Sequence, residues 1–373
     1  MTFQELNLNQ FIIKAVEEKH YETPTDVQEK AIPAILAGND LVVCAHTGSG
    51  KTAAFALAIL QSILKEPVEI ESSKLIRSLI LAPTRELAIQ IGESFEAYGK
   101  YLDIRIGVVY GGITPKQHIK VLKREPNILI ATPGRLLDLI GKGYADLSKV
   151  EIFVLDEADK MLDVKTLQDV KKIVSKLPSD RQNILFSATM PAKVMKIVYS
   201  ILKNPVKIDD KTTYKKGTNI KQQVYFVEET EKISLLLSLL KGKSYESVLI
   251  FTRTKKIADK VAKAINIQNI RTKAIHGDKN QSERLKSIEL FKNKEIKVLV
   301  ATDVAARGID ISGISYVINM NIPNVKETYI HRIGRTGRAG KNGVAISFCS
   351  SEEKNFLKKI EELQGKSIEI VSE

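Results

Sequence analysis

The sequence A-H-T-G-S-G-K-T occupies residues 45–52 and decides the fold. The apolar run at residues 41–44 predicts a buried strand before it, and the apolar residues 53–57 predict the start of a helix after it. This order is the setting of a phosphate-binding loop, in which backbone N–H groups at a helix N-terminus face an anion. Ala45 stands where the usual pattern G-x-x-x-x-G-K-[ST] has glycine, and a small residue suffices if its backbone stays in ordinary φ/ψ space. The alternative interpretation is a Gly/Ser turn between a strand and a helix.

The residues of this loop predict that it binds a nucleotide. Gly48 and Gly50 allow the backbone to curl around an anion. Lys51 can reach the β- and γ-phosphates, and the Thr52 hydroxyl can ligate Mg²⁺. The candidate phosphate-binding residues are therefore Thr47, Gly48, Ser49, Gly50, Lys51 and Thr52.

Length and composition predict two globular domains. A single core rarely grows beyond about 250–300 residues, and the chain has 373. It contains no run of about 18 apolar residues and no N-terminal signal pattern, so we expect no membrane span and a cytoplasmic protein. Two cysteines, Cys44 and Cys349, lie in apolar runs and fit buried thiols in a reducing compartment. A net charge of +13 makes a nucleic acid a candidate partner, although solvated lysine-rich faces produce similar values.

Short apolar runs mostly separated by helical patterns predict an α/β protein with parallel sheets. Expected strands in the first half are residues 41–44, 78–81, 106–109, 128–130, 152–155 and 184–186. Those in the second half are residues 224–227, 248–251, 272–275, 298–300, 316–318 and 345–348. We predict an N-terminal domain over residues 1–207, a linker over 208–217 and a C-terminal domain over 218–373.

Polar clusters follow several of these strands, at the edge where open α/β sheets bind ligands. One cluster, Asp156-Glu157-Ala158-Asp159, follows the apolar run 152–155 and has the form of a Walker B element. Asp156 would hold Mg²⁺ and Glu157 would orient and deprotonate the water that attacks the γ-phosphate. An acidic helix N-terminus is the alternative, because carboxylates are also favourable there.

These four residues spell D-E-A-D, and nearly the whole chain resembles the DEAD-box family of ATP-dependent RNA helicases. The resemblance rests on motifs that occur together and in order: A-H-T-G-S-G-K-T, P-T-R-E-L-A at 83–88, G-G at 111–112, T-P-G-R at 132–135, D-E-A-D, S-A-T at 187–189, F-T-R-T at 251–254, Q-S-E-R at 281–284, A-T-D-V-A-A-R-G-I-D at 301–310 and H-R-I-G-R-T-G-R at 331–338. It implies two tandem RecA-like domains, with ATP and Mg²⁺ as cofactors and RNA as partner.

The resemblance also implies an adenine site near the N-terminus, in the stretch 21–28. Gln28 would read the adenine edge through its amide, Tyr21 would stack on the base and Phe3 would pack from upstream. The chain departs from the family pattern at three places: His46 for Gln, His20 for Gly, and Val164-Lys165-Thr166 for Met-Gly-Phe.

In the second half, an arginine cluster at residues 331–338 could bind RNA phosphates or supply arginine fingers to ATP. The resemblance favours fingers, Arg335 and Arg338, which would reach the γ-phosphate across a cleft between domains. It also places Gly308 and Asp310 at the nucleotide, with Asp310 on the ribose. The residues implied to couple ATP and RNA are Asp159, Ser187, Thr189 and His331.

RNA contacts implied by the resemblance lie in both halves and are mostly to phosphates, so binding should be insensitive to base sequence. In the first half they are Arg85, Glu86, Gly111, Gly112, Thr132, Gly134 and Arg135. In the second half they are Arg253, Gly277, Gln281, Arg284, Thr302 and Arg307.

We therefore predict an RNA-dependent ATPase, monomeric, that closes on an RNA backbone and unwinds short duplexes or remodels RNA–protein complexes. Alternatives are an ATP-gated clamp or ribonucleoprotein assembly factor with little unwinding, a nucleotide-dependent binding module without hydrolysis, and a DNA translocase.

Overall fold

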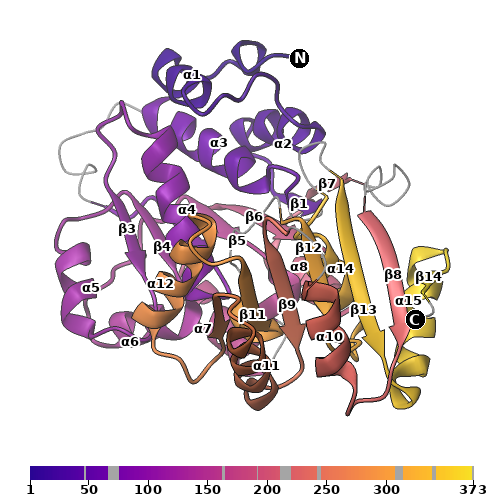
Figure 1. Ribbon diagram of the computed structural model, residues 1–373. Coiled ribbons are helices and arrows are strands. Elements are labelled where there is room, and N and C mark those ends of the chain that lie inside the picture. Colours follow the sequence, from indigo (N-terminus) through magenta and orange to yellow (C-terminus); the bar gives the residue numbers. More distant parts are fainter. Residues whose placement is uncertain are drawn as a thin grey trace. The chain divides into compact units, whose positions relative to one another are not determined.

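The computed structural model describes residues 1–45, 48–65, 75–161, 164–190, 192–210, 220–241, 245–306, 314–337 and 342–371. The chain divides into two compact units, Met1–Lys211 and Thr212–Glu373 (Figure 1). Each unit contains a seven-stranded sheet in which every pairing is parallel. The predicted class, two α/β domains with parallel sheets, is confirmed. Within the described ranges, every helix is too short or too polar to span a lipid bilayer.

The first sheet has the strand order β3-β4-β2-β5-β6-β1-β7. Its strands are β1 (Leu41–Cys44), β2 (Ser78–Leu81), β3 (Ile106–Val109), β4 (Ile128–Ala131), β5 (Ile152–Leu155), β6 (Gln182–Ser187) and β7 (Val206–Asp209). Its α-helices are α1 (Gln10–Glu17), α2 (Asp26–Leu36), α3 (Lys51–Lys65), α4 (Arg85–Tyr98), α5 (Pro115–Leu122), α6 (Pro133–Gly141), α7 (Val164–Val174) and α8 (Ala192–Ile201), with 3₁₀ turns η1 (Gln4–Leu6) and η3 (Ala158–Met161).

Helices cover both faces of this sheet, because successive residues of a strand point to opposite sides. Ile80, Val154 and Phe186 face a core that includes residues of α1 to α4. The adjacent Phe153 and Leu185 face a second core that includes residues of α6, α7 and α8. The continuous apolar strands are thus explained by burial on two sides.

Strand β7 lies at the edge of the first sheet, paired with β1, and was not predicted. It includes Ile208 and Asp209, which the predicted linker also includes, so regular structure extends two residues into residues 208–217. Only Ile208 of this strand is buried, since an edge strand exposes most of its side chains. Residues 211–217 of the linker lie outside the described residues.

The second sheet has the strand order β10-β11-β9-β12-β13-β8-β14. Its strands are β8 (Ile220–Phe226), β9 (Val248–Thr252), β10 (Thr272–Ile275), β11 (Val298–Thr302), β12 (Tyr316–Asn319), β13 (Gly343–Cys349) and β14 (Glu369–Ile370). Its α-helices are α10 (Lys232–Lys241), α11 (Lys255–Ile267), α12 (Gln281–Lys292), α13 (Asp303–Ala306), α14 (Lys326–Ile333) and α15 (Lys354–Gln364), with the 3₁₀ turn η4 (Ser351–Glu353). Residues of α10 and α11 share one core and residues of α12 and α13 another. Both cysteines are free thiols; Cys349 is buried and Cys44 half-buried.

Candidate functional site

The strand order of the first sheet separates the predicted clusters into two groups. Strands β5, β6 and β1 are neighbours, and the acidic motif, Ser187 and the 45–52 loop stand at their carboxyl ends. Strands β3, β4 and β2 are also neighbours, and the Gly-Gly pair, Thr132 and Arg85 follow them. One half of the sheet therefore carries the predicted nucleotide residues, and the other half the predicted RNA residues.

The phosphate-binding loop has the backbone that its glycines predict. Gly48 and Gly50 have φ values of 90° and 83°, in the left-handed region that glycine adopts without steric cost. Ala45 has no such conformation, which explains why alanine is accommodated at the first position. Lys51 begins α3, and its ammonium group donates to the Ala45 carbonyl at 2.6 Å. Burial lowers the pKa of Lys51, and the neighbouring Asp156 and Glu157 oppose this shift.

Two side chains of the predicted adenine motif hold this loop. The Thr25 hydroxyl donates to the Ser49 carbonyl at 2.8 Å, and the Gln28 amide donates to the Gly50 carbonyl at 3.2 Å. A Cβ atom at Gly50 would lie 2.4 Å from the Gln28 amide nitrogen, so only glycine permits this approach. Thr25 and Gln28 also form the capping box of α2. Our sequence prediction missed Thr25, although the T-x-x-Q spacing is a recognisable capping signal.

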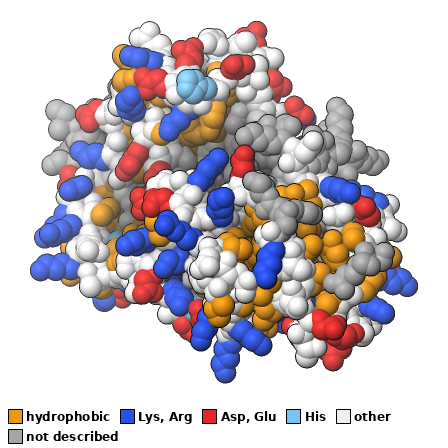
Figure 2. All heavy atoms as spheres, in the orientation of Figure 1, with side chains coloured by type: hydrophobic (Ala, Val, Ile, Leu, Met, Phe, Trp, Pro, Cys, Tyr) orange, Lys and Arg blue, Asp and Glu red, His pale blue; other side chains and the backbone are white. Residues whose placement is uncertain are grey.

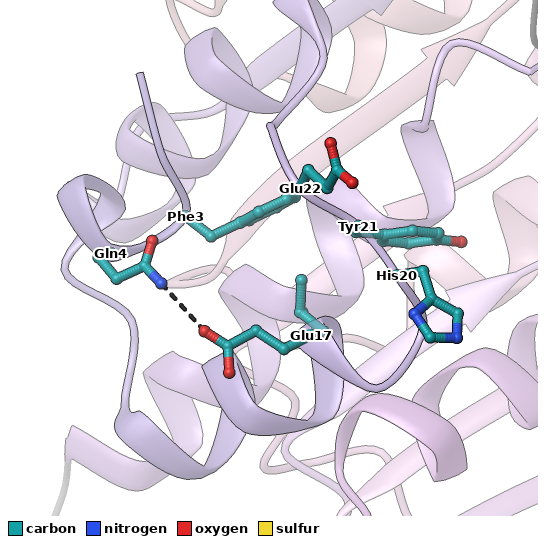
Figure 3. Close-up of a pocket in the computed structure, with 7 residues that line it drawn as sticks. Phe3, Gln4, Glu17, His20, Tyr21 and Glu22 are labelled. Atoms are coloured by element: carbon teal, nitrogen blue, oxygen red, sulfur yellow. Dashed lines mark hydrogen bonds between the residues drawn. The ribbon is translucent and has the colours of Figure 1, made fainter.

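A cavity of about 270 Å³ lies beside this motif and is lined by Phe3, Gln4, Val16, Glu17, His20, Tyr21 and Glu22. Figure 3 shows Phe3 reaching toward the segment that carries Tyr21, with Gln4 donating to Glu17 at 3.1 Å beside it. Phe3 is buried, whereas the Tyr21 ring is exposed and packs against Tyr98 with ring centroids 6.4 Å apart. The predicted aromatic residues thus border a cavity, and their contact with adenine stays a prediction.

His20 has a left-handed backbone, with φ of 56°. Glycine adopts this conformation freely, whereas histidine does so at a steric cost. The turn between α1 and α2 therefore has, at His20, the backbone conformation that favours glycine.

Asp156 and Glu157 follow β5 and are both buried. Burial, with a further contribution from Glu157, raises the pKa of Asp156 to about 7, while Lys51 opposes the rise. The Asp156 carboxylate also accepts the N–H of Glu157 at 2.8 Å. Lys160, which the sequence analysis did not select, pairs with the Glu157 carboxylate at 2.6 Å.

The predicted coupling residues of the first unit are joined by hydrogen bonds. The Thr189 hydroxyl donates to the Asp159 carboxylate at 3.0 Å, and the Asp159 N–H donates to the Ser187 hydroxyl at 3.3 Å. Ser187 in turn donates to the Thr189 carbonyl at 2.6 Å. The structure thus connects D-E-A-D with S-A-T directly, and their role in coupling stays a prediction.

On the other half of the first sheet, Arg85 lies against the Gly-Gly pair. A Cβ atom at Gly112, whose φ is 91°, would lie 1.8 Å from a terminal guanidinium nitrogen of Arg85. The Gly111 N–H donates to the Thr132 hydroxyl at 3.3 Å. Three predicted RNA-binding motifs therefore meet at one place, with Glu86 buried beside Arg85 in α4 and Gly134 in the first turn of α6.

His118 was not predicted, and it connects two of these motifs. Its Nε2 accepts the Tyr110 N–H at 3.2 Å, and its Nδ1 lies 2.8 Å from the Arg135 guanidinium, which also donates to the Ile113 carbonyl at 2.9 Å. Burial and the charge of Arg135 lower the pKa of His118 to about 4, so the imidazole is neutral. No pattern in the sequence marks this histidine, because its partners are distant in the chain.

In the second unit, neighbouring strands β10, β11 and β9 carry the predicted RNA residues Gly277, Thr302 and Arg253 near their carboxyl ends. Arg253 forms an ion pair with Glu353 and donates to the Ile322 carbonyl at 3.3 Å. At the start of α12, Gln281 is buried, and Arg284 donates to the Ala305 carbonyl of α13 at 3.4 Å. As in the first unit, the predicted RNA residues that follow strands lie at three neighbouring strands in one half of the sheet.

The helix α14 carries His331, and Arg335 follows it, almost fully buried. Between them lies Arg332, which the sequence analysis did not select. Its guanidinium forms two bonds of 2.6 and 2.7 Å to the Asp303 carboxylate and donates to the Asn319 side chain at 3.1 Å. Arg332 therefore joins the H-R-I-G-R motif to α13. The predicted residues Thr47, Arg307, Gly308, Asp310 and Arg338, with His46, lie outside the described residues.

Known proteins resemble this chain along its whole length. Residues 25–197 match the family described as DEAD/DEAH box helicase, and residues 231–340 match the helicase conserved C-terminal domain. The DEAD-box ATP-dependent RNA helicase CshA of Geobacillus kaustophilus is 41% identical over 99% of this chain and 78% of its own length. RhpA of Helicobacter pylori, with the same description, is 41% identical over 99% and 74%. The structure of S. cerevisiae Dbp5 bound to RNA and ADP BeF3 superimposes with a TM-score of 0.88 at 33% identity, covering 99% of this chain and 95% of that one.

Proposed function

The chain belongs to the DEAD-box family of ATP-dependent RNA helicases, and from that premise we propose how its residues use ATP to act on RNA. It is an RNA-dependent ATPase of two RecA-like domains. The observation that carries the mechanism is the arrangement at β1 and β5, where the 45–52 loop and Asp156-Glu157 stand in the same half of one sheet.

The loop residues are suited to hold ATP. Its backbone N–H groups and the start of α3 would bind the phosphates, as helix N-termini bind anions. Lys51, which donates to the Ala45 carbonyl, would exchange that bond for the phosphates. Gln28 keeps one amide hydrogen and one lone pair beyond its bonds to Gly50 and Thr25, so it can still read an adenine edge.

The residues around Asp156 fit Mg²⁺. Asp156 is a buried carboxylate whose pKa is raised by burial, and a divalent cation would favour its charged form. Together with the Thr52 hydroxyl it offers the oxygen ligands that this ion prefers. If the ion bound there together with ATP, it would neutralise part of the phosphate charge. Glu157 would then orient the attacking water and accept its proton.

Arg335 and Arg338 are proposed to complete the ATP site from the second domain. Hydrolysis would then depend on closure of the two domains, and closure would be favoured when ATP and RNA are both bound. We further propose that the protein acts as a cytoplasmic monomer.

The proposed RNA contacts are phosphate contacts made by arginines and glycine N–H groups. Residues 253–297 support this, since they contain thirteen Lys and Arg against five Asp and Glu and so carry +8 of the net +13. Figure 2 shows Lys and Arg side chains over α11 and α12, which belong to this segment. A basic surface of this kind attracts any RNA backbone.

The function is tested by measuring ATP turnover alone and with single-stranded RNA, single-stranded DNA or a short RNA duplex. Stimulation by RNA and not by DNA is expected, together with displacement of a strand from the duplex. Stimulation without displacement would favour an RNA clamp, and equal stimulation by DNA would contradict the proposed preference for RNA.

Adenine selectivity is expected to depend on Gln28. Gln28→Ala should reduce the ratio of kcat/KM for ATP over GTP by roughly tenfold to a hundredfold, because it removes hydrogen bonds to the base edge. Thr25→Ala is the matched control: it removes a bond to the same loop and should weaken both nucleotides equally. An unchanged ratio in Gln28→Ala would remove its proposed role in base recognition.

RNA affinity is expected to fall steeply with salt and to depend little on sequence. Each phosphate contact to a single strand should add about −0.7 to the slope of log K against log salt concentration. Titrations of unrelated strands of equal length measure both properties. A preference of about a hundredfold for one strand exceeds what phosphate contacts provide and would contradict the proposal.

A further inference from the structure

Lys160 and Glu157 form a buried ion pair next to the proposed magnesium ligand. Their side chains are 6% and 11% exposed, and the Nζ–Oε1 distance is 2.6 Å. Removing two charges from water is costly unless they contact each other in good geometry. Because separating the two side chains would leave buried charges unpaired, the short contact fixes the positions of both groups. An exposed pair three residues apart in a helix would contribute little to stability and would leave both side chains mobile.

The backbone of Glu157 is constrained as well. Its φ of 51° lies in the left-handed region, which is sterically unfavourable for a residue with a Cβ atom. The Glu157 N–H donates to Asp156, and the Glu157 carbonyl accepts the Lys160 N–H at 2.9 Å. Such strain persists only where surrounding contacts determine the conformation. Glu157 is therefore held at its backbone by Asp156 and at its carboxylate by Lys160.

We propose that Lys160 is a positioning residue for ATP hydrolysis, whose ammonium group holds the Glu157 carboxylate where it meets the attacking water. The inference rests on the proposed role of Glu157 as the base. In that step the water oxygen bonds to the γ-phosphorus, the bond to the leaving ADP oxygen breaks, and the water proton passes to Glu157. Lys160 takes no part in the proton transfer.

The first test removes the positive charge of the Lys160 side chain and keeps its approximate length. Lys160→Met is expected to lower kcat for RNA-stimulated ATP hydrolysis by roughly 10- to 100-fold, because displacing a reacting group by about 1 Å has effects of that size. KM for ATP and the affinity for a non-hydrolysable ATP analogue should change by less than about twofold. Lys160→Arg, which retains the charge, should recover most of the lost turnover. Retained analogue binding also establishes that the Lys160→Met protein is folded.

A double-mutant cycle distinguishes this inference from the role of Glu157 itself. If Lys160 acts through Glu157, then adding Lys160→Met to Glu157→Gln should lower the residual hydrolysis no further. Normal or faster turnover by Lys160→Met, with Glu157→Gln inactive, would overturn the positioning role and leave the base in place. An equal loss in both backgrounds, or no recovery by Lys160→Arg, would also overturn it. Normal hydrolysis by Glu157→Gln would remove the proposed base instead.

Discussion

Glu157→Gln is expected to lower single-turnover ATP hydrolysis by roughly 10²–10⁴-fold while ATP-dependent RNA binding persists. The substitution keeps the size of the side chain and an oxygen that can accept from Lys160, and it removes the negative charge and with it the ability to take a proton. Loss of general-base catalysis typically has this magnitude. Hydrolysis is measured with enzyme in excess, and RNA binding with a non-hydrolysable ATP analogue.

Asp156→Asn is the matched control for that experiment. The two carboxylates are adjacent and both are buried, so a substitution that damaged the site in general should reduce nucleotide binding in both variants. Asp156→Asn should weaken binding of Mg²⁺ and nucleotide, whereas Glu157→Gln should leave binding intact. If both variants lost nucleotide binding equally, or if Glu157→Gln hydrolysed ATP normally, then the separate roles of ligand and base would be wrong.

The core strands of both sheets could be predicted because they are buried on two faces. Runs such as residues 78–81 and 152–155 are continuously apolar, and a parallel strand between two helical layers requires such a run. Of the four edge strands, β3 and β10 each bury two residues and were predicted, whereas β7 and β14 were missed for lack of such burial. Ile370 is exposed, and β7 buries a single residue, so neither leaves a hydrophobic signal of useful length.

The candidate site could be predicted where its chemistry is local in sequence. The phosphate loop and the acidic motif are each contiguous, so spacing alone identifies them. Lys160, His118 and Arg332 act through partners whose position depends on tertiary structure or on an unusual backbone, as at Glu157. A single sequence does not contain those distances.

The order of the strands explains how the predicted ATP and RNA residues come to share one sheet. The predicted RNA motifs follow β2, β3 and β4, which are neighbours in one half of the sheet, whereas the predicted nucleotide and coupling motifs follow β1, β5 and β6 in the other half. The bonds from Asp159 to Ser187 and Thr189 lie in the nucleotide half, while His118 and Arg135 lie beyond β2 in the other. At the boundary between the two halves Leu81 of β2 pairs with Leu155 of β5; Asp156 follows Leu155 directly, and Arg85 stands four residues after Leu81.

Arg335→Ala is expected to lower RNA-stimulated ATP turnover by roughly 10³-fold or more. An arginine finger that stabilises charge on the γ-phosphate contributes about 10³–10⁵ in rate in related phosphoryl transfers. RNA affinity without nucleotide should remain within about threefold of the original, since this role involves ATP and not RNA phosphates. Turnover is measured at saturating ATP and RNA, and RNA affinity by titration without nucleotide.

The same two measurements decide between the interpretations that the arginine cluster leaves open. An RNA phosphate site would give the reverse result, with weaker RNA binding and nearly normal turnover at saturating RNA. Because Arg335 is only 5% exposed, truncation could also destabilise the second unit, so Arg335→Lys serves as the control. Lysine keeps the charge but lacks the planar fork of donors, and it should preserve the melting temperature while turnover stays low. Normal turnover in Arg335→Ala would contradict the finger and, with it, the proposal that hydrolysis waits for the second domain.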